Sequence, residues 1–74
     1  NYINSIDGCT WIIENYTLEF DWFKGFSYLI RGKTYDLTGE RDKAVEDYKL
    51  SMKYTEYFPE YNEAKYLLKN TFKN

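Results

Sequence analysis

The pattern of apolar and small residues is clearest in the middle of the chain, where it has the period of two helices. Tyr28, Gly32 and Tyr35 recur at intervals of three and four residues, which places them on one face of a helix. A second series with the same period follows a short break and consists of Ala44, Val45, Tyr48 and Met52. The pattern therefore predicts two consecutive helices, the second from about residue 41 to about residue 55.

The break between the two predicted helices is a short turn centred on Gly39. This glycine can adopt the left-handed backbone conformation that ends many helices. Glu40 and Asp42 place negative charge at the start of the next helix, where backbone N–H groups lack partners. Two helices joined by so short a turn run antiparallel and approach each other closely. We predict that Gly32 and Ala44 make this close contact, because both are small.

Six residues of the predicted hairpin fall in the register of a known repeat signature: Tyr28, Gly32, Tyr35, Gly39, Ala44 and Tyr48. On these residues the hairpin resembles one tetratricopeptide repeat, and the match covers about 30 residues, close to the length of a repeat. There are departures from the pattern. Tyr28 stands where the family has tryptophan, Arg31 stands where leucine is usual, and Pro59 comes about three residues late.

A third helix is predicted after the hairpin, from about residue 59 to about residue 72. Pro59 suits its first turn, because proline has a fixed φ and no N–H group. An apolar stripe follows at helical spacing: Tyr61, Ala64, Leu67, Leu68 and Phe72. The resemblance implies that this helix caps the exposed side of the last repeat. The chain then divides into an aromatic-rich segment (1–20), the hairpin (21–56) and the capping helix (57–74), within a single domain.

The first 20 residues are predicted to be extended or to form a β-hairpin-like segment. Tyr16, Leu18, Phe20 and Trp22 alternate with polar residues, which is the period of a half-buried strand. A helix is the alternative, because another series has helical spacing: Ile3, Ile6, Thr10, Ile13, Thr17 and Phe20. Gly8 and the many β-branched residues disfavour that helix. Asp21 is predicted to cap the first helix of the hairpin. The predicted fold class is thus mainly α with an extended N-terminal segment.

Composition limits the classes of function. The chain has 74 residues and a net charge of −2, and its basic residues form no stripe that would bind nucleic acid. No apolar run is long enough to span a bilayer. With one cysteine and no histidine, we predict no disulfide, metal site or cofactor. One repeat buries too little surface alone, so we expect a C-terminal piece of a longer protein or a self-associating domain. The sequence does not indicate a compartment.

The residue inventory also argues against an enzyme. Without histidine, the usual Ser-His and Cys-His nucleophile pairs are absent. Five carboxylates cluster in sequence: Asp36, Glu40, Asp42, Glu46 and Asp47. They alternate with basic residues in a pattern typical of an exposed helix face, where a carboxylate is not tuned for acid or base catalysis.

The resemblance implies a binding surface. In tetratricopeptide proteins the first helix of each repeat lines a groove that takes peptide segments. Carried onto this chain, the groove residues are Phe26, Leu29, Lys33, Asp36 and Leu37. Lys33 is the only basic residue among them, so a clamp for a C-terminal carboxylate is not supported and an apolar groove is expected. The sequence therefore predicts a protein-interaction module that binds a protein, a peptide segment or the rest of its parent chain.

The aromatic content suggests a second binding surface. Phe, Trp and Tyr make up 22% of the chain, and nine residues are tyrosine. Most are expected in the core, but four are predicted to form an exposed docking patch: Trp11, Trp22, Phe23 and Phe26. Such a patch favours the alternative function of a structural domain that docks on a neighbour or on a second copy, as a homodimer. A weaker alternative is a sugar-binding platform flanked by Asn15, Glu19 and Asp21.

Overall fold

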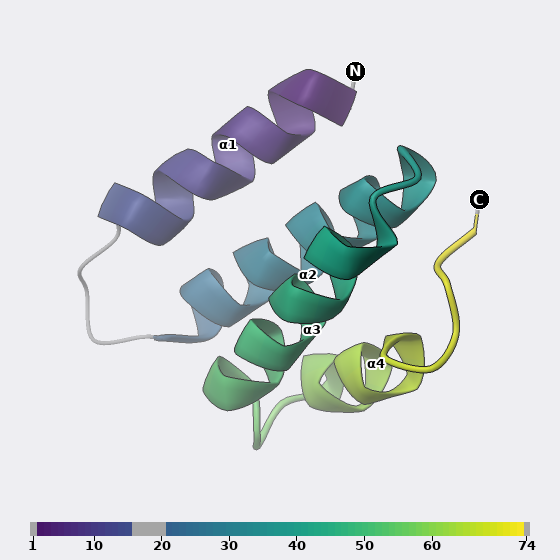
Figure 1. Cartoon of the computed structure of the whole chain (residues 1–74). Coiled ribbons are helices and arrows are strands. Elements are labelled where there is room, and N and C mark those ends of the chain that lie inside the picture. The colour runs from purple at the N-terminus through teal and green to yellow at the C-terminus, as the bar shows by residue number, and fades with distance from the viewer. Residues whose placement is uncertain (1, 16–20, 74) are drawn as a thin grey trace.

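The computed structural model describes residues 2–15 and 21–73, and the regular secondary structure within them consists of α-helices. The helices are α1 (Tyr2–Asn15), α2 (Asp21–Leu37), α3 (Arg41–Tyr54) and α4 (Pro59–Leu67). Figure 1 shows α2 and α3 side by side at the centre, with α1 on one side and α4 on the other. The main contacts between helices join neighbours in the chain and are most extensive between α2 and α3, and a smaller contact joins α2 and α4. The mainly helical fold class is confirmed.

The turn between α2 and α3 has the geometry that the sequence predicts. Gly39 has a φ of 82°, in the left-handed region. The N–H of Glu40 donates to the carbonyl of Tyr35 at 2.8 Å, and the N–H of Gly39 donates to the carbonyl of Asp36 at 3.2 Å. This pair of bonds is a Schellman motif, which satisfies carbonyl groups at the end of a helix. The prediction that Gly39 ends the first helix of the hairpin is confirmed.

Two glycines allow α2 and α3 to approach closely. A Cβ atom on Gly32 would lie 2.6 Å from Cε1 of Tyr48 and 3.2 Å from the carbonyl oxygen of Ala44. The predicted close contact between Gly32 and Ala44 is therefore confirmed, and the Tyr48 ring is part of it. A Cβ atom on Gly25 would lie 2.5 Å from Cγ2 of Thr55. Gly25 precedes Gly32 by two helical turns, so both glycines lie on the same face of α2.

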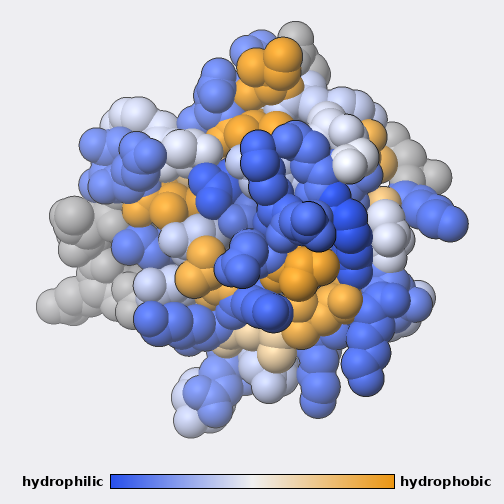
Figure 2. Space-filling view, viewed as in Figure 1, coloured by the Kyte–Doolittle hydropathy of each residue, from blue (hydrophilic) through white to orange (hydrophobic). Residues whose placement is uncertain are grey.

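The core lies where α2, α3 and α4 meet. Its buried residues are Leu29, Ala44, Tyr48, Ala64 and Leu67. The outer face of α3, in contrast, exposes charged side chains of both signs: Asp42, Lys43, Glu46, Lys49 and Lys53. Figure 2 views this side and shows a largely hydrophilic surface with small, separate hydrophobic patches. None of the helices in residues 2–15 and 21–73 is both long enough and apolar enough to cross a bilayer.

The prediction of an extended or β-hairpin-like N-terminal segment is wrong, because Tyr2–Asn15 is the helix α1. Cys9 is buried, and Ile6 and Ile13 are half-buried beside it on the helical spacing. The Ser5 hydroxyl lies 3.3 Å from that of Thr34 in α2. The face of α1 that carries these residues packs against α2. Its burial outweighs the weak helix propensity of glycine and β-branched residues.

The alternation that favoured a strand falls mostly on residues 16–20, which lie outside the described residues. Trp22, the last member of that series, is in α2. The predicted capping by the Asp21 side chain is also outside the described part of the chain, although α2 begins at this residue.

Helix α4 begins at Pro59 as predicted but ends at Leu67, earlier than the predicted residue 72. The guanidinium of Arg41 explains the early end. It donates to the carbonyl of Leu67 at 2.7 Å and to the carbonyl of Leu68 at 2.9 Å. These carbonyls are satisfied by a side chain from α3 and need no further helical turn. Helix α3 itself matches its predicted limits within one residue.

Candidate functional site

An ion pair with a buried carboxylate joins α2 to α3, and its arginine also contacts α1. The Arg31 guanidinium contacts both carboxylate oxygens of Asp47, with Nε to Oδ2 at 2.7 Å and Nη2 to Oδ1 at 2.8 Å. Its Nη1 donates to the Thr10 hydroxyl of α1 at 2.9 Å. The hydrogen bonds that Arg31 donates to Asp47 raise the pKa of Arg31 above its ordinary value. Arg31, which departs from the leucine of the repeat signature, thus makes an ionic contact with α3 and a hydrogen bond to α1.

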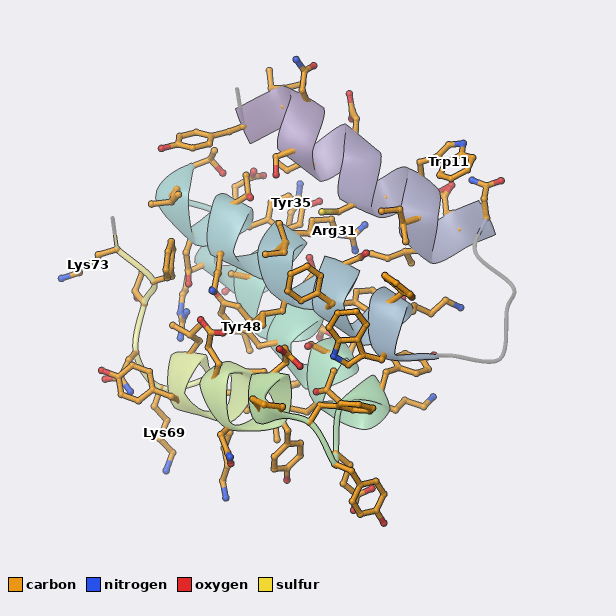
Figure 3. The ribbon with its side chains drawn as sticks, turned by 180° about the vertical axis from the view of Figure 1, so that it is seen from behind. Trp11, Arg31, Tyr35, Tyr48, Lys69 and Lys73 are labelled. Carbon is orange, nitrogen blue, oxygen red and sulfur yellow. The ribbon has the colours of Figure 1, made fainter. Side chains whose placement is uncertain are left out.

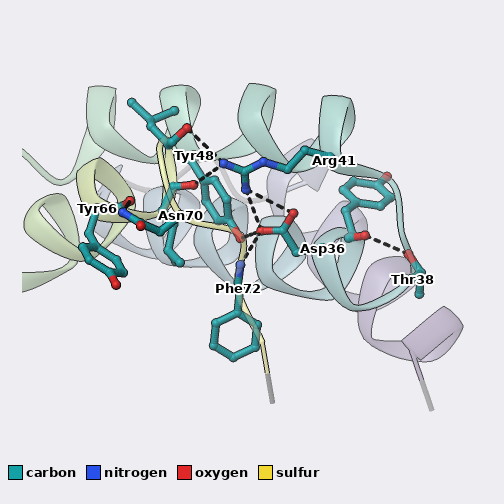
Figure 4. A network of polar contacts seen from close by, with 10 residues as sticks. Asp36, Thr38, Arg41, Tyr48, Tyr66, Asn70 and Phe72 are labelled. Atoms are coloured by element: carbon teal, nitrogen blue, oxygen red, sulfur yellow. Dashed lines mark hydrogen bonds and ion pairs between the residues drawn. The ribbon is translucent and has the colours of Figure 1, made fainter.

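A second buried carboxylate joins α2 to α3 and to the C-terminal segment. The Asp36 side chain is fully buried and accepts hydrogen bonds from the Tyr48 hydroxyl at 2.6 Å and from Nη1 of Arg41 at 2.8 Å. The backbone N–H of Phe72 donates to it at 2.9 Å, as Figure 4 shows. The prediction of an exposed carboxylate face is wrong for Asp36 and Asp47, because each is buried against an arginine.

The hydrogen bond between Tyr48 and Asp36 predicts that the free energy of unfolding depends on pH in the alkaline range. Burial, reinforced by the hydrogen bond to Asp36, raises the pKa of Tyr48 above its ordinary value of 10.0. Below that pH both the folded and the unfolded chain keep this proton. Above it the unfolded chain loses the proton and the folded chain retains it, so the free energy of unfolding falls with rising pH, by up to about 1.4 kcal/mol per pH unit.

The measurement is urea unfolding of the parent chain and of Tyr48→Phe at several pH values between 8 and about 11, a range that brackets ordinary tyrosine ionisation. The variant lacks this proton, so its stability is expected to fall less steeply with pH. Equal slopes for the two proteins would contradict a raised pKa at Tyr48.

One side of the molecule is formed by α2 and α4 together, and Figure 3 views it directly. We call this surface the α2–α4 face and define it by Trp22, Phe26, Lys33, Glu60 and Glu63. Two polar contacts link its helices. The Trp22 indole N–H donates to Oε1 of Glu60 at 2.7 Å, and the Lys33 ammonium pairs with Glu63. These contacts link α4 to α2, in addition to the more extensive packing of α4 on α3.

Four rings gather at the N-terminal end of this face, and we call them the aromatic cluster: Trp22, Phe23, Phe26 and Phe58. Trp22 stacks on Phe26 with ring centroids 5.2 Å apart and an interplanar angle of 13°. It meets Phe23 edge-on at 4.9 Å and Phe58 at 6.2 Å. Phe23 is 46% exposed, Phe26 37% and Phe58 46%. Large aromatic rings that are both fixed and exposed suit recognition of another apolar surface.

Three of the four predicted patch residues are therefore together, and Trp11 is apart from them. Trp11 is 64% exposed on α1 and, in Figure 3, points away from the other helices. Phe58 is the fourth member of the cluster, and it was not predicted. Its position directly before Pro59 could have indicated a connection between two helices, where an aromatic side chain can reach α2. Of the residues named for a sugar platform, Asn15 uses its amide to bond the Trp11 carbonyl at 2.9 Å, and Glu19 is outside the described residues.

The predicted groove residues occupy different environments. Phe26 is exposed in the aromatic cluster, while Leu29 and Asp36 are buried. Lys33 and Leu37 are half-buried, and the Lys33 ammonium lies 5.2 Å from the centroid of the Phe72 ring. The five residues thus do not form one open surface, because α4 and the C-terminal segment cover the second half of the α2 face.

Comparisons with known proteins give no relative from which the role of this surface could be inferred. Neither the family models, nor the curated proteins, nor the solved structures that were searched contain a match to this chain. Among the described residues, no three side chains of aspartate, glutamate or cysteine gather as a metal site would require. The chemistry that the α2–α4 face offers is apolar and aromatic contact, flanked by two acidic groups and one lysine.

Proposed function

We propose that this chain is a non-catalytic protein-interaction module of tetratricopeptide type that binds an apolar segment of a partner on the α2–α4 face. The partner is either a separate protein or another part of a longer chain. The observation that carries the proposal is the aromatic cluster, in which Trp22 is stacked, hydrogen-bonded to Glu60 and surrounded by three exposed phenylalanines.

The physical argument concerns the cost of binding. Side chains that must be ordered on association reduce affinity, by about 0.5–1.5 kcal/mol for each immobilised side chain. Trp22 is already fixed by Glu60 and by its stacking on Phe26, so little ordering is left for this ring on binding. Aromatic residues are also enriched among the few positions that dominate the energy of an interface. The hairpin signature of Gly32, Gly39 and Ala44 supports the tetratricopeptide type, through the close packing and turn described above.

The test is selection of peptides from a random display library on the immobilised chain, followed by titration of the selected peptides. The Trp11→Phe variant leaves Trp22 as the only tryptophan, so its fluorescence reports on the aromatic cluster. We expect its emission to shift to shorter wavelength on binding. We expect Phe26→Ala to weaken binding at least about tenfold, the effect of losing 1.4 kcal/mol at a central interface residue.

The matched control is Trp11→Ala, which removes an exposed aromatic from a different part of the surface. It is expected to leave peptide affinity unchanged. Peptides that bind Phe26→Ala as tightly as the parent chain would remove the aromatic cluster as the binding surface. Failure to select any apolar peptide would count against the interaction module itself.

A second candidate function, self-association through the N-terminal segment, is favoured by the exposed apolar residues of α1. Tyr2 is 44% exposed, Ile3 69% and Trp11 64%. Light scattering over a range of concentrations separates the two candidates. A dimer that Trp11→Ala dissociates supports self-association through α1, whereas a monomer at all concentrations supports an interaction module with a different partner.

A further inference from the structure

The C-terminal segment, residues 68–73, lies against the second half of α2 and makes two specific contacts there. The N–H of Phe72 donates to the buried carboxylate of Asp36 at 2.9 Å. The Phe72 ring lies under the Lys33 ammonium, 5.2 Å from its centroid. The side chains of Lys69, Asn70, Thr71 and Lys73 are exposed, and Figure 3 shows Lys69 and Lys73 pointing outwards. The segment is therefore held at two points: Leu68 packs against the core and its carbonyl accepts from Arg41, and Phe72 makes the two contacts with α2.

The groups beneath this segment are held together independently of Phe72. Asp36 also accepts from the Tyr48 hydroxyl and from Arg41, and Arg41 is fixed in turn by carbonyl groups at the end of α4. Figure 4 shows these groups converging on the carboxylate. If Phe72 moved away, Asp36 would keep its hydroxyl and guanidinium partners. The charged acceptor and the nearby ammonium are thus preorganised for a donor N–H and an aromatic ring.

We propose that Lys33, Asp36, Arg41 and Tyr48 form a peptide-binding site for an extended segment that carries an aromatic residue. In this chain the C-terminal segment occupies the site, and a partner segment of the same chemistry displaces it. A backbone N–H for the carboxylate and a ring for the ammonium are what such a segment supplies. This inference shares with the proposed function the idea that α2 binds a peptide. The two sites differ, because this one lies at the opposite end of α2 from the aromatic cluster.

A tethered occupant competes strongly with a free one. A segment joined to its site by a short linker has an effective concentration on the order of millimolar. A free peptide of equal intrinsic affinity therefore binds the parent chain weakly, because only a small fraction of the sites is open. A substitution that weakens binding of the C-terminal segment raises the fraction of molecules whose site is open. The apparent affinity for the free peptide then rises by the same factor.

The experiment uses the full chain and a fluorescein-labelled peptide with the sequence of residues 68–73. Phe72→Ala removes the ring of the tethered occupant and leaves the site intact. We expect it to bind this peptide at least about tenfold more tightly than the parent chain does. Thr71→Ala, a change in the same segment at an exposed residue, should behave like the parent chain. A peptide with alanine in place of its phenylalanine should not bind either protein.

Hydrogen exchange on the unmodified chain provides a second measurement. If the segment is displaceable, the Phe72 amide should exchange at least about tenfold faster than the amide of Tyr48 in the core, because local opening needs less free energy than global unfolding. Exchange of the two amides at the same rate would overturn the proposal, as would a Phe72→Ala chain that is unfolded or binds the peptide no better than the parent.

The outcomes also separate this inference from the proposed function. Phe26→Ala is expected to leave binding of the 68–73 peptide unchanged, because Phe26 lies in the aromatic cluster. If selected apolar peptides bind that cluster while the 68–73 peptide binds no variant, the second site is wrong and the interaction module stands. If only the 68–73 peptide binds, the aromatic cluster is wrong as the working surface.

Discussion

Replacing Gly32 with leucine is expected to destabilise the fold by about 3 kcal/mol or more, the upper range for overpacking a tightly packed contact. A Cβ atom at this position would already lie 2.6 Å from the Tyr48 ring and 3.2 Å from the Ala44 carbonyl. Tyr48 is fully buried and bonded to Asp36, so its ring has no free space to move into. A small domain has a total stability of about 5 kcal/mol, so thermal unfolding should show a partly or wholly unfolded variant.

Gly8 provides the control, because it is also a glycine within a helix but has nothing within 4 Å of its Cβ position. Gly8→Ala is expected to stabilise the chain by about 0.5–1 kcal/mol, since alanine is the better helix former and meets no obstacle. A Gly32→Leu chain that melts at the parent temperature would show that α2 and α3 are not in the close contact described here.

Replacing Arg31 with leucine, the residue usual at this position of the repeat signature, is expected to destabilise the chain by about 3–5 kcal/mol. The substitution leaves the Asp47 carboxylate, whose side chain is only 3% exposed, without its guanidinium partner. An uncompensated buried charge costs more than the added apolar contact returns. Denaturant unfolding with a linear extrapolation measures the loss directly.

The double variant Arg31→Leu with Asp47→Leu distinguishes a lost ion pair from lost packing. Removing both charges should recover most of the stability, because two apolar side chains can replace a buried pair at little net cost. A matched surface change, Lys43→Ala, breaks the exposed pair with Glu40 and should leave the melting temperature nearly unchanged. A double variant as unstable as the sum of its single changes would mean that the ionic contact is not what Arg31 contributes.

The helical hairpin could be predicted from the sequence because its determinants are local. The spacing of Tyr28, Gly32 and Tyr35 indicates a helix face, and Gly39 marks the position in the hairpin where the backbone turns through positive φ. The limits of α3 and the start of α4 at Pro59 followed from equally local rules. The heptad spacing of Gly25 and Gly32 places both glycines on one face of α2, and Gly25 makes the second close approach to α3.

The N-terminal helix and the end of α4 were mispredicted because their determinants are distant in sequence. Residues 2–15 have weak helix propensity, and their helical face is stabilised by contact with α2. Helix α4 stops at Leu67 because Arg41, 26 residues earlier in the chain, takes its last carbonyls. Neither partner can be identified from the pattern of the segment itself.

The candidate site divides in the same way. Its aromatic composition was visible in the sequence, and Trp22, Phe23 and Phe26 are neighbours simply because they share one helical turn. Phe58 joins them only because α4 folds back beside α2. The buried states of Asp36 and Asp47 were likewise invisible, because a carboxylate on a helix resembles a surface residue until an arginine from another helix is placed against it.

By itself the sequence determined the two central helices, their glycine turn and their close contact, because backbone conformation and side-chain size act within a few residues. Only the tertiary structure decided which carboxylates are buried, which aromatic rings gather on the α2–α4 face and what covers the rest of it. Burial and charge pairing depend on which surfaces meet, and that depends on the packing of all the helices together.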